Sequence, residues 1–281
     1  MTATAAPPLS RTRRTPSPTL LLSLLVVAFF LAAAIIPGVL ATHDPLQFDL
    51  VAALQSPSLS HLAGTDEAGR DLYSRIIFGT RESLSIGLGA TALSLAIALV
   101  LGVAAGLGGR VVDAIVSRSL DVLFAFPMLL VALLFVAAFG PSPATLVLAV
   151  GIGTAPGYAR MIRGQVLAVC TSPYVEAAHA VGHSSWRVLR QHIVPNAVRP
   201  LVAVATLSIG QSIVWASGLS FLGLGVAPPS PEWGALLDAG RAYMTHAWWL
   251  EVLPGLAIVL LALAVTTIGR HLQQRLEGHR A

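Results

Sequence analysis

Six long apolar stretches without a charged side chain constrain this chain more than any other feature. Each is close to the roughly 20 residues that a helix needs to cross a bilayer core of about 30 Å. Lipid offers no hydrogen-bond partners, so each stretch must satisfy its own backbone, which favours helices. The predicted spans are approximately Leu20–Leu40, Leu84–Leu107, Val122–Phe139, Ala144–Tyr158, Leu201–Leu222 and Val252–Ile268. The fourth is short, and Pro156 near its end leaves its boundary open.

The composition supports the same fold class, an all-α integral membrane protein. The 281 residues are 55% hydrophobic and only 11% charged, with a mean hydropathy of +0.78, whereas soluble domains carry about 25% charged residues. Arg11, Arg13 and Arg14 precede the first stretch, as they would a signal peptide, but its apolar core is too long for one, so we expect a retained span. The single cysteine excludes an intrachain disulfide and a four-cysteine metal site.

The arginines predict how the chain is oriented. With the N-terminus in the cytoplasm, most of the 17 basic residues fall on the cytoplasmic side, as the positive-inside rule requires. Those left outside are Arg70, Arg75, Arg81 and Arg241. We therefore expect both termini in the cytoplasm. The same arginines explain the net charge of +4, so we expect contact with membrane lipid and no nucleic-acid partner.

The predicted spans contain no ionisable side chain. Ionisable groups at membrane depth usually mark proton or ion paths, so their absence argues against a pump or a secondary transporter. The sequence also lacks a Walker A loop, and no Ser/His, paired-Asp or HExxH set lies at membrane depth, so we expect no enzyme activity. Gly102 and Gly106 have the spacing of close helix packing. Gly151 and Gly153 fit helix packing better than a nucleotide fingerprint.

The longest predicted cytoplasmic loop, residues 160–200, contains two short helices by its local signals. Ser172 suits the N-cap of the first and Pro173 its first turn. Glu176 lies where the helix dipole favours a carboxylate, and Gly182 suits the C′ position that ends the helix. Such a short helix is marginal alone, so it needs a packing partner, either the rest of the loop or another protein.

A second helix is predicted to begin at Ser184 or Ser185 and to end at Pro195, with Arg199-Pro200 before the fifth span. Trp186, Leu189 and Ile193 are expected to line one face of it.

Three further groups have structural explanations that we favour over ligand binding. His179 and His183 are four residues apart, but Ala180 stands where zinc proteases carry Glu, so we expect no metal ligand. Asp66, Arg70 and Asp71 are expected to pair with one another at a membrane-interface turn, although Asp66, Glu67 and Asp71 could also attract a cation. The expected place of Trp233, Trp248 and Trp249 is the outer interface.

Several motifs together resemble the permease subunits of binding-protein-dependent ABC importers. Glu176-Ala177-Ala178, then Gly182, then Ile193-Val194-Pro195 resembles their EAA loop, with Val194 in place of the usual Leu. Other segments resemble the branch of dipeptide, oligopeptide and nickel permeases. These are Gly64-Thr65-Asp66-Glu67-Ala68-Gly69-Arg70-Asp71 with Ser74-Arg75, Gly157-Tyr158-Ala159-Arg160 with Arg163-Gly164-Gln165, Leu219-Ser220-Phe221-Leu222-Gly223-Leu224-Gly225, and Pro231-Glu232-Trp233-Gly234.

The resemblance implies a type I importer permease fold in a bacterial inner membrane. It implies a second permease, giving a heterodimer, two ABC ATPase subunits inside and a solute-binding protein outside. ATP and Mg²⁺ would be used by the ATPase, and this chain would bind no cofactor. The ATPase-coupling residues would be Glu176, Ala177, Ala178, Gly182 and Pro195. The extracytoplasmic family motif would comprise Gly64, Thr65, Asp66, Gly69, Arg70 and Asp71.

These inferences divide the chain into five parts: a cytoplasmic tail (1–19), a first span (20–40), an extracytoplasmic loop (41–82), the permease domain (83–270) and a cytoplasmic tail (271–281). Di- or oligopeptides are the leading expectation for the cargo. Nickel or a metal chelate is the alternative, and a secondary transporter is a distant one. Small uncharged residues are expected to line the path, with selectivity left to the binding protein.

Overall fold

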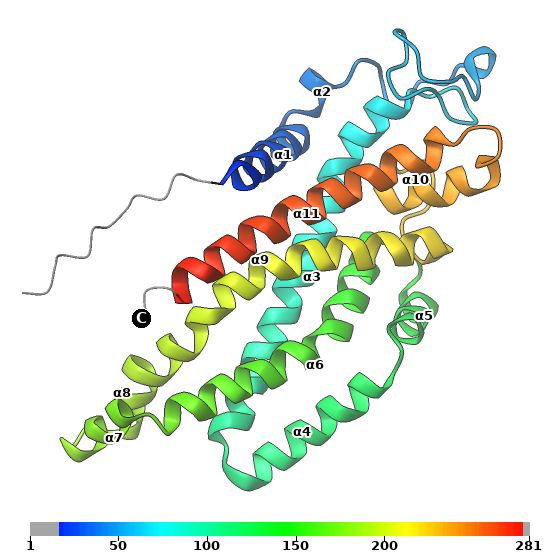
Figure 1. Cartoon of the computed structure of the whole chain (residues 1–281). Coiled ribbons are helices and arrows are strands. Elements are labelled where there is room, and N and C mark those ends of the chain that lie inside the picture. The colour runs from blue at the N-terminus through cyan, green and yellow to red at the C-terminus, as the bar shows by residue number, and fades with distance from the viewer. Residues whose placement is uncertain (1–16, 278–281) are drawn as a thin grey trace, which may run out of the picture.

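The structure, a computed structural model, describes residues 17–277, and these fold as a bundle of helices (Figure 1). The helices are α1 (Pro18–Ile35), α2 (Pro37–Leu40), α3 (Leu72–Leu107), α4 (Gly109–Ala125), α5 (Met128–Phe139), α6 (Pro143–Cys170), α7 (Pro173–Ala180), α8 (Ser185–Val188), α9 (Val194–Leu219), α10 (Trp233–Gly240) and α11 (Trp249–Glu277). Short 3₁₀ or π segments occupy Leu50–Ala52, Leu189–Ile193, Ser220–Leu224 and Arg241–Tyr243. The arginines predicted in the tails, Arg11, Arg13, Arg14 and Arg280, lie outside the described residues.

Within residues 17–277, five helices are long and apolar enough to cross a membrane, and four of them extend beyond the spans predicted from hydropathy. α6 passes straight through Pro156, so the short fourth span is in fact a 28-residue helix. The first span is shorter than predicted, because α1 ends at Ile35 and the short α2 follows. The added ends of the longer helices carry the charged side chains that the predicted spans lack, including those of Arg75 and Arg163.

The predicted third span, Val122–Phe139, is wrong as a single helix. α4 ends at Ala125 and α5 begins at Met128, and their axes differ by 89°. Pro127 explains the break, because it has no N–H to donate and its ring disfavours helical backbone at the preceding residue. Phe126 accordingly has an extended conformation, with φ −78° and ψ 126°.

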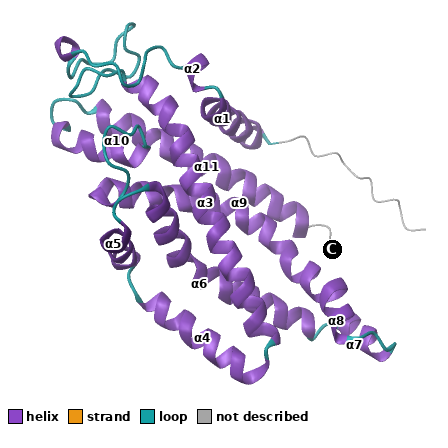
Figure 2. Ribbon diagram, turned by 180° about the vertical axis from the view of Figure 1, so that it is seen from behind, coloured by secondary structure: helices purple, strands orange, loops and turns teal. Residues whose placement is uncertain are grey.

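Both ends of the described chain lie on the same side of the bundle. Ser17, the N-cap of α1, places its Oγ 2.9 Å from Nε2 of His271 near the end of α11. A chain that starts and finishes on one side crosses an even number of times, so the bent pair α4–α5 supplies the sixth crossing. α10 and the loop that precedes α3 lie at the end of the bundle opposite α7 and α8 (Figures 1 and 2). Which end faces the cytoplasm stays a prediction from the arginines.

Close packing of α3 against α6 forms the centre of the bundle. The two run parallel, since Ser94 bonds Thr154 at 2.9 Å and Gly102 lies farther along against Ala159. A Cβ atom on Gly102 would lie 2.7 Å from the Ala159 carbonyl oxygen, so only glycine allows this approach. The helix-packing role predicted for Gly102 and Gly106 is confirmed.

Candidate functional site

A cavity of about 480 Å³ lies at the break between α4 and α5. Its walls come from the α4–α5 corner, the middle of α6 and α9, and no ionisable acid or arginine is among them. The lining residues are Phe124, Phe126, Pro127, Met128, Gly153, Thr154, Gly157, Tyr158, Gln211 and Trp215. The cavity is uncharged, with four aromatic side chains beside the small residues Gly153, Thr154 and Gly157. Pro127 inside an apolar stretch is the signal in the sequence that could have indicated the break beside it.

Polar groups on the cavity wall are arranged to hold one another. The Tyr158 hydroxyl donates to Oε1 of Gln211 at 3.0 Å, which joins α6 to α9. Next to the cavity, the Arg160 guanidinium lies 4.6 Å from the centre of the Phe124 ring and donates to Asp121 at 2.8 Å. The cavity can therefore offer aromatic faces and an amide–hydroxyl pair to a neutral polar solute.

The first predicted helix of the 160–200 loop is confirmed as α7. Ser172 occupies the N-cap position, although its hydroxyl donates to the Val169 carbonyl at 2.5 Å instead of accepting from the helix. Gly182 follows the C-cap Val181 with φ +82°, the left-handed conformation expected at C′. Glu176 lies in the first turn and is exposed, as is Ala177, while Ala178 packs into the core beside Val175.

The second predicted helix differs from its prediction. Ser184 caps α8, but the chain then passes through the π segment Leu189–Ile193 directly into α9. Pro195 does not end a helix; it lies in the first turn of α9, where its missing N–H costs nothing. Trp186 is 70% exposed, so the buried face consists of Val188 and Ile193, with Leu189 half-buried.

An exposed apolar surface covers the tip formed by α7 and α8. Tyr174 on α7, Val181 after it and Trp186 on α8 all expose large apolar side chains. This tip lies at the end of the molecule in both views (Figures 1 and 2), so it projects beyond the helices that cross the bilayer. Exposed apolar residues gathered at a projecting tip are typical of a contact surface for another protein.

At the opposite end, Asp66 holds the 64–71 motif together. Its Oδ2 accepts from Arg70 Nε at 2.7 Å and from Arg75 Nη1, and its Oδ1 accepts from the backbone N–H groups of Ala68 and Arg70 at 2.9 Å each. Arg75 also donates to the carbonyl oxygens of Pro229 and Ser230. The motif thus attaches its loop to the connection between α9 and α10.

The predicted pairing of Asp66 with Arg70 is confirmed, but Asp71 is not part of that ion pair. Asp71 is the N-cap of α3, and its Oδ2 accepts from the backbone N–H and hydroxyl of Ser74 at 2.9 and 2.7 Å. Its other oxygen faces His61 and His43. Burial acts to raise the pKa of Asp71, but the hydrogen bonds from Ser74 and His61 and the nearby His43 outweigh burial and lower it. The remaining motif residues, Gly64, Thr65 and Gly69, shape the turn that the Thr65–Asp71 bridge closes.

The tryptophans predicted at the outer interface are mostly core residues. Trp233 has no exposed surface, packs edge-to-face on Phe30 at 5.3 Å and donates its indole N–H to the Ile76 carbonyl. Trp249 is also buried and donates to the Thr65 carbonyl at 3.1 Å. Of the three, only Trp248 is half exposed. Both buried indoles connect elements distant in sequence, which hydropathy cannot reveal.

Glu232, beside Trp233, is a buried carboxylate that caps α10. It accepts from the backbone N–H groups of Gly234 and Ala235 at 2.9 Å each and from the Ser220 hydroxyl at 2.5 Å. The Ser83 hydroxyl on α3 donates to it as well. Burial raises the pKa of Glu232, and these hydrogen bonds offset the effect only in part.

The raised pKa predicts that Glu232 makes stability depend on pH. The folded chain binds the Glu232 proton more tightly than the unfolded chain does. The stability that this proton contributes is therefore complete below the ordinary glutamate pKa and is lost as the pH rises through the pKa of Glu232 in the folded chain. We expect the melting temperature of Glu232→Gln, measured in detergent, to rise relative to that of the wild type as the pH increases from about 4 to 7. Parallel melting curves at all pH values would contradict this expectation.

The sequence comparisons identify the family of the chain. Residues 98–278 match the family described as binding-protein-dependent transport system inner membrane component. The chain belongs to this family of permeases. The family and fold predicted from the motifs are thereby confirmed, and the permease is a multi-pass protein of a bacterial inner membrane.

Three curated relatives resemble the permease over most of its length. It is 35% identical over 257 residues to the dipeptide transport system permease protein DppC of Alkalihalophilus pseudofirmus, covering 92% of this chain and 84% of the relative. It is 40% identical over 224 residues to the di/tripeptide permease DppC of Pseudomonas aeruginosa (80% and 74% covered). It is 41% identical over 230 residues to the glutathione permease GsiD of Pectobacterium atrosepticum (82% and 76% covered).

Solved structures share the fold of the permease. An amino acid ABC transporter solved with histidines and the inward-facing MetNI methionine ABC transporter each match with a TM-score of 0.59 and 17% identity. Each match covers 72% of this chain and 94% or 96% of the solved chain. At that identity the likeness concerns the fold alone.

Proposed function

We propose that this permease forms half of the translocation path of an ATP-driven importer of short peptides. The observation that carries the proposal is the uncharged, aromatic cavity at the α4–α5 break, in a chain whose relatives are named for dipeptide, di/tripeptide and glutathione transport. A peptide bond is a neutral polar group. The cavity offers such a group the Tyr158 hydroxyl and the Gln211 amide beside apolar faces.

A second permease subunit completes the path in this proposal. Much of α5 is apolar and exposed, including Leu130 and Leu134. α5 lies at the edge of the bundle (Figures 1 and 2), and its first residue, Met128, lines the cavity. An exposed apolar helix beside an open cavity suits the seam between two halves of a path. Selectivity would then lie with an extracytoplasmic binding protein, since the cavity has no charged group to fix a peptide terminus.

An ATPase subunit docks on the tip of α7 and α8 in this proposal. α7 is eight residues long and exposes Tyr174, while Val175 and Ala178 anchor it to the core beneath; Val181 after α7 and Trp186 on α8 are exposed as well. Such a helix can transmit a push from a partner to the crossing helices. ATP hydrolysis would take place in that partner.

Purification with partners, followed by uptake, tests this function. The tagged chain is isolated from native membranes in mild detergent, and partners are identified by mass spectrometry. We expect a second permease and a Walker A ATPase among the partners. In intact cells, we expect uptake of a labelled dipeptide to require ATP and to survive a protonophore. A chain recovered alone that transports without ATP would overturn the proposal.

A further inference from the structure

We propose that His43, His61 and Asp71 form a site for one divalent transition-metal ion of the zinc class. Their ligand atoms all lie within 4.8 Å of one another. The three residues come from the segment after α2, the loop before the Thr65–Asp71 bridge and the N-cap of α3. The site lies at the end of the bundle that carries α10, apart from the translocation cavity, so it does not depend on the proposed cargo.

The spacing of the three groups fits a tetrahedral ion. Oδ1 of Asp71 lies 2.9 Å from Nδ1 of His61 and 3.7 Å from Nδ1 of His43. Around a zinc ion with bonds of about 2.0–2.1 Å, tetrahedral ligand atoms are about 3.3 Å apart. The two distances lie on either side of that value, and the three ligand atoms as a set lie within 4.8 Å of one another, so the His43 ring must move toward His61 and Asp71 to admit the ion.

The Asp71 carboxylate is held so that one oxygen faces the histidines. Oδ2 accepts from the N–H and the hydroxyl of Ser74, and from the Thr42 hydroxyl at 3.3 Å. Those bonds leave Oδ1 toward His61 and His43. Hydrogen bonds that orient a ligating carboxylate are the usual outer shell of a metal site.

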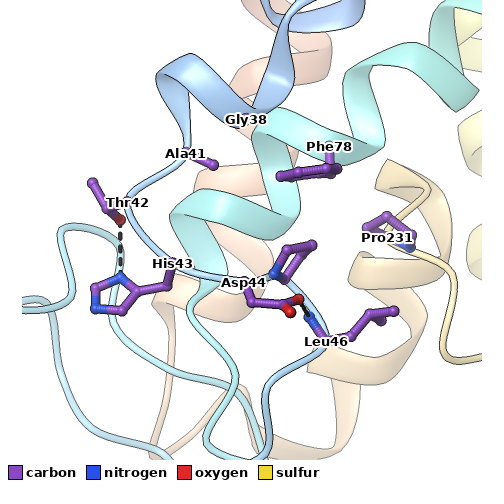
Figure 3. Close-up of a pocket in the computed structure, with 9 residues that line it drawn as sticks. Gly38, Ala41, Thr42, His43, Asp44, Leu46, Phe78 and Pro231 are labelled. Atoms are coloured by element: carbon purple, nitrogen blue, oxygen red, sulfur yellow. Dashed lines mark hydrogen bonds between the residues drawn. The ribbon is translucent and has the colours of Figure 1, made fainter.

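The backbone places His43 over the same oxygen. The N–H of His43 donates to Ser74 Oγ at 3.0 Å, and that hydroxyl in turn donates to Asp71. A His–Asp hydrogen bond accounts for His61, and Nδ1 of His43 lies 3.7 Å from the same oxygen, beyond hydrogen-bond distance. Nδ1 of His43 instead bonds Thr42 Oγ1 at 3.0 Å, which is the dashed line between these two residues in Figure 3. The His43 side chain is 38% exposed, so its ring can turn from Thr42 to an ion.

A small cavity of about 190 Å³ gives access to the three groups. Besides them it is lined by Gln47, Gly69 and two more carboxylates, Asp44 and Asp49, and no arginine is among its described lining residues. The surplus of carboxylates attracts a cation. Two imidazoles with one carboxylate favour zinc-class ions over Ca²⁺ or Mg²⁺, which prefer oxygen ligands. Three protein ligands leave a fourth position for water from the cavity.

Metal titration of the full-length chain tests the site. The protein carries a tag without histidine, is purified in detergent, stripped with EDTA and titrated with Co²⁺, whose visible absorption reports coordination geometry. Zn²⁺ is then added as a competitor. The variants are His43→Gln and His61→Gln. The control is His246→Gln, an exposed histidine between α10 and α11 that contacts Thr245.

We expect one tetrahedral Co²⁺ per chain, displaced by Zn²⁺, and loss of affinity by at least ~10-fold in His43→Gln and His61→Gln but not in His246→Gln. Zn²⁺ should also slow proteolysis of the 41–71 loop in the wild type and not in His43→Gln. Because His43 is partly exposed, its replacement leaves the core intact. Equal Co²⁺ affinity in the wild type and His43→Gln, or an octahedral spectrum, would overturn the proposal.

Discussion

Replacing Asp66 by alanine is expected to destabilise the folded permease by about 3–5 kcal/mol, the range for breaking a buried ion pair from one side. Asp66 is 2% exposed and accepts from two guanidinium groups, those of Arg70 and Arg75, which are themselves buried. After the substitution, Arg70 retains Glu67, but Arg75 retains only the carbonyl oxygens of Pro229 and Ser230. The Arg75 guanidinium would then be buried without a carboxylate partner.

Thermal unfolding in detergent measures this effect. For a domain of this size, the loss corresponds to a fall in melting temperature of roughly 10 °C. Asp238→Ala is the matched control, because Asp238 pairs with Arg241 at 3.6 Å on the same end of the molecule but in solvent. An exposed pair contributes at most about 1 kcal/mol. Similar melting temperatures for Asp66→Ala and Asp238→Ala would show that the buried network is not needed for stability.

Local signals in the sequence were sufficient for α7 but not for the α4–α5 break. Pro173 in the first turn and Gly182 at C′ each act within one turn of the helix end, so their neighbours alone determine the outcome. Hydropathy sums over a window of about 20 residues and is insensitive to direction. It therefore merged the last turn of α4 with α5 into one span, and only Pro127 within that stretch indicated the 89° bend.

Contacts between distant residues account for what the sequence could not predict. Arg75 contacts Pro229 across 154 residues, and Trp233 reaches Ile76 across 157. The same aromatic and charged residues would suit a membrane interface, so composition cannot distinguish the two places. The His43, His61 and Asp71 group was missed for the same reason: their spacing of 18 and 10 residues follows no helix or metal-motif period, and the fold alone gathers them.

Replacing Gly182 by valine is expected to reduce transport at least tenfold while the chain still inserts into the membrane. Gly182 has φ +82° with open space around its Cα, so the obstacle is backbone conformation and not a clash. A β-branched residue in the left-handed region costs about 1–3 kcal/mol. That cost falls on the turn between α7 and α8. Because α7 and α8 pack on the core through Val175 and Val188, the strain would displace the tip that we propose docks the ATPase.

The matched variant is Gly182→Asn, which adds a side chain of similar size but tolerates the left-handed conformation. Reconstituted complexes of both variants are compared for peptide uptake, ATP hydrolysis and amount of ATPase retained. If the left-handed turn carries the coupling, Gly182→Asn keeps most of the uptake, and Gly182→Val loses it while membrane levels stay equal. Undiminished uptake by Gly182→Val would separate the turn from coupling. Equal losses in both variants would assign the effect to side-chain bulk at the docking surface, since only the valine strains the backbone.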